Sequence, residues 1–285
     1  MQLKTIGRDL LLVDQQNFDP FVSCECGQCF RFERVCDRSY RLFACGRRLD
    51  IEKTAEGWLF LDIAEEEFRS GFYEYFDLER DYGEIIRGFS QDNIVSRAAE
   101  EGSGIRIFRQ DPWETLISFI ISQNNNIPRI KKIINSLCAL LGEEKNGFYK
   151  FPSAEEILTA GLDGLAPIKS GFRAKYIIDA AEKVSSGEVS IERIKKSDYE
   201  TALNELKKIK GVGDKVANCV LLFGFGFHEA FPIDVWVKRV IGKYYGENFD
   251  PKSFGKYAGI AQQYLFNFER NSNEGDETEN AKTKP

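Results

Sequence analysis

The stretch Leu206-Lys-Lys-Ile-Lys-Gly-Val-Gly-Asp-Lys-Val-Ala-Asn-Cys-Val-Leu-Leu-Phe223 decides the fold of this chain. It predicts a helix, a tight turn at Gly211-Val212-Gly213, and a second helix that opens at about Asp214. Glycines allow positive φ angles and leave the backbone N–H groups of the turn uncovered. Together with the positive end of the second helix, Gly211 and Gly213 therefore predict an anion site that suits a DNA phosphate.

Lys215 lies in the first turn of the second helix. A cation is electrostatically unfavourable there, which favours the neutral amine, and a neutral amine can act as a nucleophile. Pro232-Ile233-Asp234 opens a later helix and supplies a carboxylate. Two simpler interpretations stay open, because Lys215 could contact only a phosphate and Asp234 could act only as a helix N-cap. Hairpins of this kind also occur in DNA-binding modules that carry out no chemistry.

Composition sets the class of protein. The chain has 285 residues, of which 42% are hydrophobic and 29% charged, as in globular proteins. No run approaches the ~18 apolar residues of a membrane span, and the first residues lack the apolar core of a signal peptide. We therefore expect no membrane association and an intracellular location, in the cytoplasm on the chromosome, or in the nucleus if the source is eukaryotic.

The charge balance is acidic, with a net charge of −6 and a pI of about 5.2. Most DNA-binding proteins are basic overall, so docking to DNA would have to rest on a local basic face. Residues 271–285 carry four acidic residues and almost no apolar ones. They predict a disordered acidic tail that adds to the negative total.

Seven cysteines, an odd number, favour free thiols over a disulfide framework in an intracellular protein. Cys24-x-Cys26-x-x-Cys29 is the densest group, but no second cysteine pair or histidine follows nearby to complete a four-ligand metal site. We expect these cysteines to be small buried residues on strands, and we expect neither a metal nor a cofactor.

The pattern predicts an α+β fold in which an N-terminal antiparallel sheet domain with helices, residues 1–105, precedes an all-α domain, residues 106–270. Strand-like composition marks residues 38–44 and 57–63, with a connecting turn over 50–57 and a further candidate strand over 27–32. Asp111-Pro112-Trp113-Glu114 is a strong helix start, and the helix after it is almost wholly apolar. A final helix is predicted from about Phe254 to Arg270.

Three consecutive asparagines, Asn124, Asn125 and Asn126, separate two apolar helices. Such residues form helices poorly and are costly to bury. They predict a polar loop with an N-cap for the next helix, or a row of amides that face a ligand such as the edge of a base.

Several separated stretches, covering nearly everything except the tail, resemble the 8-oxoguanine DNA glycosylase/lyases of the helix–hairpin–helix glycosylase superfamily. They are Gly27-Gln-Cys-Phe-Arg31, Tyr75-Phe-Asp-Leu78, Arg109-Gln-Asp-Pro112, Gln123-Asn-Asn-Asn-Ile-Pro-Arg129, Gly171-Phe-Arg-Ala-Lys-Tyr176, Gly211-Val-Gly-Asp-Lys-Val-Ala-Asn-Cys219, Pro232-Ile-Asp-Val235 and Ala258-Gly-Ile-Ala-Gln-Gln-Tyr-Leu-Phe266. The hairpin lysine with the later Pro-x-Asp is specific to the lysine-using branch, and the asparagine run is specific to the 8-oxoguanine family.

The resemblance implies a role for each matching residue. Lys215 is implied as the catalytic nucleophile and Asp234 as its paired carboxylate. The base pocket would comprise Gly27, whose carbonyl would accept the N7–H of 8-oxoguanine, the two stacking residues Cys219 and Phe266, and the amide of Gln262. The opposite cytosine would be read by Asn124, Arg129 and Arg173, with Phe172 as a wedge beside it.

The sequence departs from the family pattern at two positions. Trp236 stands where many eukaryotic members have histidine, which puts a phosphate contact in doubt. Phe172 stands where relatives often have tyrosine, which keeps the stacking surface and removes a hydroxyl.

The implied function is excision of 8-oxoguanine, opposite cytosine, through a lysine Schiff base with associated abasic-site lyase activity. The expected partner is double-stranded DNA that contains 8-oxoguanine, and the expected oligomeric state is a monomer. The alternatives are a helix–hairpin–helix DNA-binding protein without catalysis, or a glycosylase for another damaged base.

Overall fold

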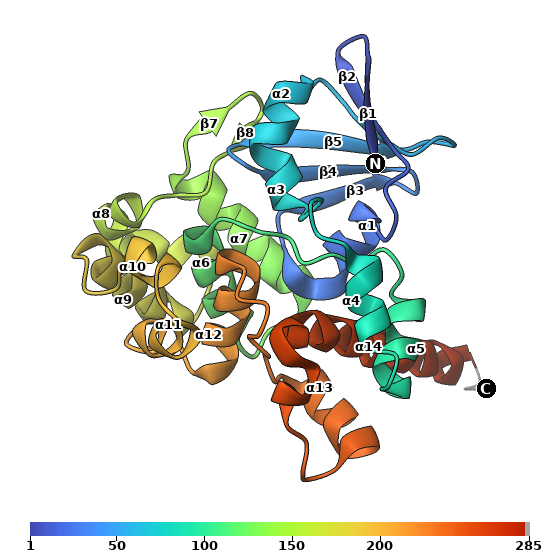
Figure 1. Ribbon diagram of the computed structural model, residues 1–285. Helices are drawn as coiled ribbons and strands as arrows, with labels where there is room; N and C mark the ends of the chain where they lie inside the picture. Colours follow the sequence, from blue (N-terminus) through green and yellow to red (C-terminus); the bar gives the residue numbers. More distant parts are fainter. Residues whose placement is uncertain (283–285) are drawn as a thin grey trace.

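The structure is a computed structural model that describes residues 1–282, with side chains described to Ser272. Its N-terminal part is a six-stranded antiparallel sheet with the strand order β1-β2-β6-β5-β4-β3 (Figure 1). The strands are β1 (Gln2–Ile6), β2 (Asp9–Val13), β3 (Phe32–Cys36), β4 (Ser39–Ala44), β5 (Arg47–Lys53) and β6 (Trp58–Phe60). An N-terminal antiparallel sheet was predicted, and it is confirmed.

The predicted strands at 38–44 and 57–63 correspond to β4 and β6. The predicted turn over residues 50–57 is wrong in its first half, because β5 continues to Lys53 and pairs with both β4 and β6. Leu49 and Ile51 explain this extension, since both side chains are fully buried and alternate with the more accessible Arg48 and Asp50.

The candidate strand over residues 27–32 is also wrong. The helix α1 (Pro20–Ser23) runs into the π-helical turn η1 (Cys24–Gln28), in which Gly27 has a φ of 83°, and β3 begins only at Phe32. Cys24, Cys26 and Cys29 are buried free thiols, as expected, but they lie in and just after this turn rather than on strands.

Gln28 holds the η1 turn in place from a fully buried position. Its amide nitrogen donates to the carbonyls of Ser23 at 2.9 Å and Arg106 at 2.7 Å, and its amide oxygen accepts from the backbone N–H of Phe108 at 2.7 Å. A buried amide with all these bonds made fixes the backbone around it. The neighbouring Gly27 is therefore presented on a rigid support.

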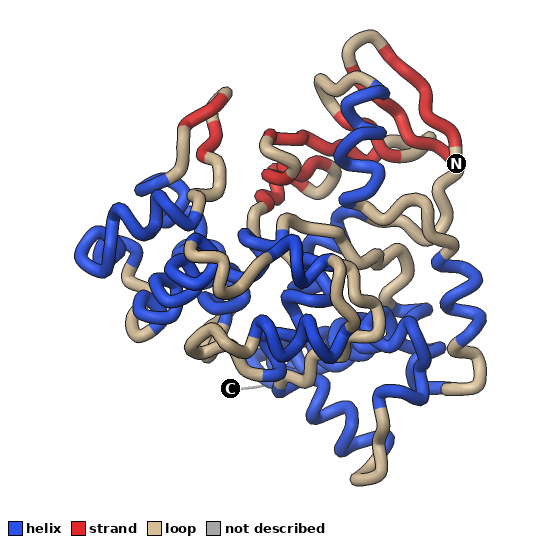
Figure 2. The backbone as a smooth tube through the Cα atoms, turned by 60° about the vertical axis from the view of Figure 1, so that its left-hand side comes forward, coloured by secondary structure: helices blue, strands red, loops and turns tan. Residues whose placement is uncertain are grey.

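Helices make up most of the rest of the described chain (Figure 2). The short helices α2 (Glu65–Glu67), η2 (Phe68–Phe72) and α3 (Tyr73–Tyr75) follow the sheet. The helical body contains α4 (Tyr82–Gly88), α5 (Asn93–Glu101), α6 (Pro112–Ser122), α7 (Ile127–Leu141), α8 (Ala154–Leu165), η3 (Ala166–Ile168), α9 (Arg173–Ser185), α10 (Ile191–Lys195), α11 (Tyr199–Leu206), α12 (Asp214–Val220), η4 (Leu221–Phe225), α13 (Val235–Val240), η5 (Ile241–Tyr245), η6 (Pro251–Tyr257) and α14 (Ala258–Lys282), with a small hairpin of β7 (Glu144–Lys145) and β8 (Phe148–Tyr149).

Local signals fixed the ends of two central helices as predicted. The Asp111 carboxylate accepts from the N–H of Glu114 at 2.8 Å at the start of α6. Asn126 accepts from the N–H of Arg129 at 2.9 Å at the start of α7. Such side-chain caps satisfy N–H groups that the first turn of a helix leaves without a partner.

The buried apolar side chains of the described chain form two hydrophobic cores. One lies against the sheet and includes buried side chains from Leu10 to Leu78 and Phe108, and the other fills the helical body from Tyr82 onward and also includes Cys26 and Phe30. Helices α4 and α5 therefore pack with the helical body, where α5 lies beside α14 (Figure 1). The domain boundary at residue 105 stays a prediction, while the cores separate near Leu78.

Arg106 joins the two parts. This almost fully buried guanidinium donates to the carbonyls of Asn17 at 2.8 Å, Asp77 at 2.6 Å and Arg80 at 3.0 Å. Because a buried cation needs several partners, these bonds hold the loops around the junction together.

Helix α14 continues past Arg270, where the sequence predicted its end, to Lys282. Most of the predicted disordered tail, residues 271–285, lies outside the described side chains, and residues 283–285 lie outside the description altogether. The prediction of disorder therefore stays a prediction.

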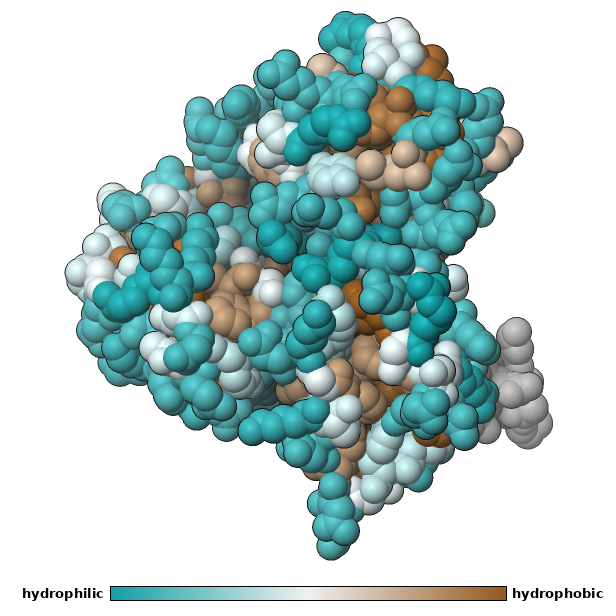
Figure 3. All heavy atoms as spheres, in the orientation of Figure 1, coloured by the Kyte–Doolittle hydropathy of each residue, from teal (hydrophilic) through white to brown (hydrophobic). Residues whose placement is uncertain are grey.

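None of the helices within residues 1–282 has both the length and the apolar composition of a membrane-spanning segment. Hydrophilic residues cover most of the face that Figure 3 shows.

Candidate active site

The hairpin between α11 and α12 brings its two glycines into different surroundings. Gly211 has a φ of 79°, and a Cβ built there would lie 2.6 Å from Cγ of Tyr176. Gly213 has an extended φ of −95°, lies at the N-cap of α12, and has open space where a Cβ would stand. Gly211 is therefore required by the packing of the turn, whereas Gly213 leaves the backbone of the turn open to a ligand.

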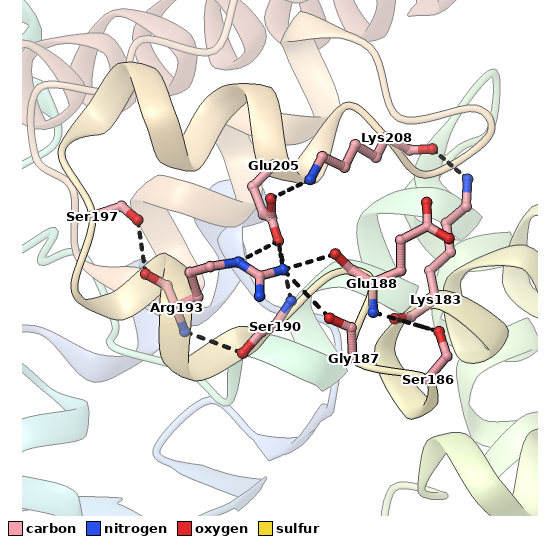
Figure 4. A network of polar contacts seen from close by, with 9 residues as sticks. All are labelled: Lys183, Ser186, Gly187, Glu188, Ser190, Arg193, Ser197, Glu205 and Lys208. Atoms are coloured by element: carbon pink, nitrogen blue, oxygen red, sulfur yellow. Dashed lines mark hydrogen bonds and ion pairs between the residues drawn. The ribbon is translucent and has the colours of Figure 1, made fainter.

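Lysines surround this turn. Lys207, Lys208 and Lys210 are exposed, and Lys207 pairs with Asp214 at 2.5 Å. The buried Glu205 accepts from Lys208 at 2.7 Å and from Nε of Arg193 at 2.9 Å, which ties the end of α11 to α10 (Figure 4). Three lysines thus lie exposed beside the turn, and each of them pairs with an acidic side chain, Lys210 with Asp179 at 3.1 Å.

Lys215 and Asp234 line one cavity of about 730 Å³. Asp234 caps α13 by accepting from the N–H groups of Trp236 at 3.0 Å and Val237 at 2.9 Å. Burial raises the pKa of the Asp234 carboxyl, although these two bonds and the charge of Lys215 act in the opposite direction. The ammonium nitrogen of Lys215 lies 5.1 Å from the ring centre of Phe119. An amine and a carboxylate thus share a partly desolvated site.

The residues of the predicted base pocket line the same cavity. Gly27, Cys219, Gln262 and Phe266 all line it, together with Lys215. A Cβ built on Gly27 would lie 3.1 Å from the ring of Phe266, so a larger residue would be strained at a φ of 83° and would require the ring to shift by a few tenths of an ångström. These residues come from η1, α12 and α14, which are far apart in the sequence.

Gln262 stands out among the cavity residues. The residue is only 3% exposed, and its Oε1 atom has no hydrogen-bond partner among the described residues. A buried amide oxygen without a partner is costly, so this atom is available to accept a hydrogen bond from a group that enters the cavity.

Cys219 supplies an uncharged surface. Burial raises the pKa of its thiol to about 11, with the nearby charge of Asp234 adding to the rise and that of Lys215 opposing it. A neutral, polarisable sulfur can pack against the flat face of an aromatic ring.

The predicted readers of the opposite strand are placed less uniformly. Asn124 is exposed, has a positive φ of 48°, and lines the cavity. Arg129 and Phe172 do not line it, although both are exposed, Phe172 by 50%. These three residues lie at or next to the ends of α6, α7 and α9.

Arg173 is buried and already hydrogen-bonded. Its guanidinium donates to the carbonyl of Gln123 at 2.8 Å, of Asn124 at 3.0 Å and of Ser170 at 3.1 Å, and it lies 4.5 Å from the ring centre of Phe172. In this structure the guanidinium of Arg173 therefore binds the backbone of the asparagine loop and does not present its donors to solvent.

Sequence reasoning missed two supporting residues, Gln28 and Asn218. The amide oxygen of Asn218 accepts from the hydroxyl of Tyr199 at 2.7 Å and from the N–H of Phe231 at 3.1 Å, and its amide nitrogen donates to the carbonyl of Asp214 at 2.8 Å. Neither residue could be found from periodicity, because each also binds partners well outside its own helix or turn: Tyr199 and Phe231 for Asn218, and Arg106 and Phe108 for Gln28.

Comparison with known proteins agrees with this geometry. Residues 10–116 match the 8-oxoguanine DNA glycosylase N-terminal domain, and residues 117–254 match the HhH-GPD superfamily of base excision DNA repair proteins. A probable N-glycosylase/DNA lyase of Methanothermobacter thermautotrophicus is 32% identical over 247 residues, covering 75% of this chain and 78% of that protein. The chain belongs to the 8-oxoguanine DNA glycosylase family.

Other members of the family support the same assignment. The N-glycosylase/DNA lyase of Saccharomyces cerevisiae is 39% identical over half of this chain and 42% of its own length. The crystal structure of Clostridium acetobutylicum 8-oxoguanine glycosylase/lyase, in complex with double-stranded DNA containing cytosine opposite 8-oxoguanine, superposes with a TM-score of 0.89 at 37% identity, covering 96% of this chain and 99% of that one. As a family member the chain is a DNA glycosylase, and the predicted fold class is confirmed.

Proposed function

We propose that this chain removes 8-oxoguanine from double-stranded DNA and then cleaves the abasic site, with Lys215 as the nucleophile. The observation that carries the proposal is the single cavity of about 730 Å³ that holds Lys215 and Asp234 beside Gly27, Gln262 and Phe266. A cavity of this size accommodates one purine nucleoside. The damaged base cannot be reached inside a duplex, so it must be flipped out at a cost of a few kcal/mol.

The chemistry follows from the amine and the carboxylate. As the bond between C1′ and N9 breaks, positive charge develops on the sugar, and the carboxylate of Asp234 stabilises it. The neutral amine of Lys215 forms a bond to C1′ as the base departs with the electron pair of the broken bond; the new ammonium group loses a proton, and the base takes up a proton. Opening of the sugar ring gives a Schiff base, which permits loss of a C2′ proton and expulsion of the 3′-phosphate.

The proposal assigns the discrimination between 8-oxoguanine and guanine to the backbone carbonyl of Gly27. 8-Oxoguanine carries a hydrogen on N7, whereas guanine has a lone pair there, so a backbone carbonyl of Gly27 would attract the first base and repel the second. Gln262 supplies an amide for the pairing edge of the base, and its unpartnered oxygen supports this role. Cys219 and Phe266 would hold the two faces of either purine and so add affinity without discrimination.

Recognition of the base on the opposite strand is assigned to the polar loop before α7 and to the start of α9. Phe172 is the exposed wedge, and Asn124 and Arg129 are free to approach the orphaned cytosine. Reading by Arg173 as well requires at least one of its bonds to the carbonyls of Gln123, Asn124 and Ser170 to be exchanged for the base. The hairpin glycines Gly211 and Gly213 receive a phosphate of the DNA backbone.

The remaining expectations complete the proposal. The protein acts as a monomer on chromosomal DNA within the cell, and it needs no cofactor for the steps above, since the amine of Lys215 supplies the nucleophile.

Borohydride trapping tests the proposal. Borohydride added during turnover on a duplex with 8-oxoguanine opposite cytosine should fix the wild-type enzyme to the DNA, whereas Lys215→Gln should bind the lesion duplex and give no adduct. Undiminished trapping by the variant would show that Lys215 is not the nucleophile. A wild-type protein that binds the duplex without cleaving it would support the DNA-binding module instead.

Substrate panels separate the lesion assignments. Duplexes with 8-oxoguanine opposite each normal base measure the opposite-base preference, and duplexes with alkylated purines or oxidised pyrimidines test the alternative lesions. Faster excision of one of those bases than of 8-oxoguanine would reassign the pocket.

A further inference from the structure

The buried Asp179 on α9 lies under the hairpin turn, although it is not part of the site described above. The residue is 4% exposed, and its Oδ2 atom accepts from the backbone N–H of Lys210 at 2.7 Å. Lys210 directly precedes Gly211, so this bond fixes the backbone at the entrance to the turn. A buried carboxylate that accepts a backbone N–H makes a strong, charge-assisted hydrogen bond.

Two further contacts from α9 reach the same turn. The ring of Tyr176 packs against Gly211 so closely that a Cβ there would lie 2.6 Å from its Cγ atom. Lys183 donates to the carbonyl of Lys208 and pairs with Asp179 at 3.2 Å (Figure 4 shows the Lys183 contact to Lys208). Tyr176, Asp179 and Lys183 are spaced three and four residues apart, so they form one face of α9 that is directed at the hairpin.

The charge of Asp179 makes this arrangement unusual. A carboxylate beneath a phosphate-binding turn repels the phosphate, and Asp179 also pairs with the ammonium group of Lys210 at 3.1 Å. The charge of Asp179 is therefore unfavourable toward a bound phosphate, although Lys183 and Lys210 stabilise it in the free protein. Its hydrogen bond to the Lys210 N–H offers a benefit that can outweigh the repulsion.

We propose that Asp179 is a positioning residue that seats the hairpin turn for a DNA phosphate through its hydrogen bond to the Lys210 backbone, at some cost in electrostatic attraction. The same helix begins next to the wedge Phe172 and carries Arg173. Helix α9 thus sets the spacing between the readers of the opposite strand and the hairpin. This inference rests on the proposed phosphate contact of the hairpin.

Two substitutions separate the hydrogen bond from the charge. Asp179→Asn keeps an oxygen acceptor for the Lys210 N–H and removes the negative charge, whereas Asp179→Ala removes both. We expect Asp179→Asn to bind an abasic-analogue duplex about threefold more tightly than wild type at low salt, because a charge that repels phosphate is gone. We expect Asp179→Ala to bind about tenfold more weakly, because the turn is no longer held.

Amide hydrogen exchange in the DNA-free protein measures the order of the turn directly. The Lys210 amide should exchange faster in Asp179→Ala and at nearly the wild-type rate in Asp179→Asn. Asp77→Ala is the matched control, because Asp77 is a buried carboxylate that pairs with Arg80 at 2.8 Å away from the hairpin. It should lower the thermal midpoint without changing exchange at Lys210.

Either of two results would overturn the inference. If Asp179→Ala binds as tightly as wild type and the Lys210 amide stays protected, Asp179 does not hold the turn. If Asp179→Asn loses affinity and protection as Asp179→Ala does, charge pairing holds the turn and the hydrogen bond does not. Should Asp179→Ala fail to fold, weaker binding by Asp179→Asn alone contradicts the proposal.

The amide-exchange measurement needs no DNA, so its result does not depend on whether the proposed function is correct. A wild-type protein that fails to bind the abasic duplex would refute the proposed DNA contact, while the Lys210 exchange would still report whether Asp179 seats the turn.

Discussion

The two hairpin glycines should respond in opposite ways to the same substitution. An alanine at position 211 would have to adopt a φ of 79°, and its methyl group would clash with the ring of Tyr176. Left-handed backbone costs a residue other than glycine about 1–2 kcal/mol, and overpacking adds about 1–3 kcal/mol, so Gly211→Ala should destabilise the fold by roughly 2–5 kcal/mol. In a chain of this size that corresponds to a fall of roughly 5–15 °C in Tm.

Gly213 provides the matched comparison. Its φ is −95° and its Cβ position is open, so Gly213→Ala should change the unfolding free energy by no more than about 1 kcal/mol. The methyl group would instead stand between the backbone N–H groups of the turn and a phosphate. Loss of one such contact should weaken binding to an abasic-analogue duplex about tenfold.

Thermal unfolding and equilibrium binding of the two variants, measured side by side below both Tm values, test this reasoning. The reasoning would be refuted by an equal loss of Tm in both variants, or by wild-type affinity in Gly213→Ala. The first result would mean that the open space at Gly213 is closed in solution, and the second that the turn does not contact the DNA.

Four further predictions concern the pocket, the charges and the tail. Phe266→Ala should slow excision of 8-oxoguanine without releasing normal guanine, measured on lesion and undamaged duplexes, because the ring adds affinity rather than discrimination. Burial raises the pKa of Asp234, so its contribution to stability is fully present below the unfolded-state pKa of about 4 and is lost as pH rises through the folded-state value. Asp234→Asn, which keeps an oxygen to cap α13, should therefore raise Tm at pH 7 and abolish excision, with the Tm difference disappearing below about pH 4. Affinity for DNA should fall with salt by about 0.9 log units per phosphate neutralised for each tenfold rise, and removal of residues 271–285 should leave excision intact while speeding association at low salt; an unfolded truncation would contradict the predicted disorder.

Local signals in the sequence were enough to place the hairpin and the caps. Gly211 marks a turn that needs positive φ, and Asp111 and Asn126 each stand directly before a helix whose N–H groups they cap. These features depend on neighbours within four residues, so the sequence shows them directly.

The η1 turn could not be predicted in the same way. The segment around Gly27 alternates in polarity like a strand, but Gln28 binds backbone groups near residues 106 and 108 and so stabilises a π-helical turn. The buried bonds of Arg173 to the asparagine loop were equally invisible. In both cases the deciding partner lies about fifty or more residues away, and no periodicity records it.

Grouping of the base-pocket residues came from the family resemblance rather than from spacing. Cys219, Gln262 and Phe266 were assigned one by one from motif positions, and the structure brings all three to one cavity with Lys215. Their catalytic and binding roles stay predictions until variants are measured.

The wall at Gly27 has a consequence for how this enzyme can diverge. The amine and the carboxylate come from α12 and from the start of α13, entirely within the helical body, whereas Gly27 comes from the first thirty residues of the chain. Under the proposed roles, the reacting groups lie in the helical body, whereas the contact that distinguishes 8-oxoguanine from guanine lies at Gly27, in a different part of the chain. If Gly27 selects the base as proposed, changes in the η1 turn or its Gln28 support would alter which base is removed while the cleavage of abasic sites continues, so the two activities could diverge separately.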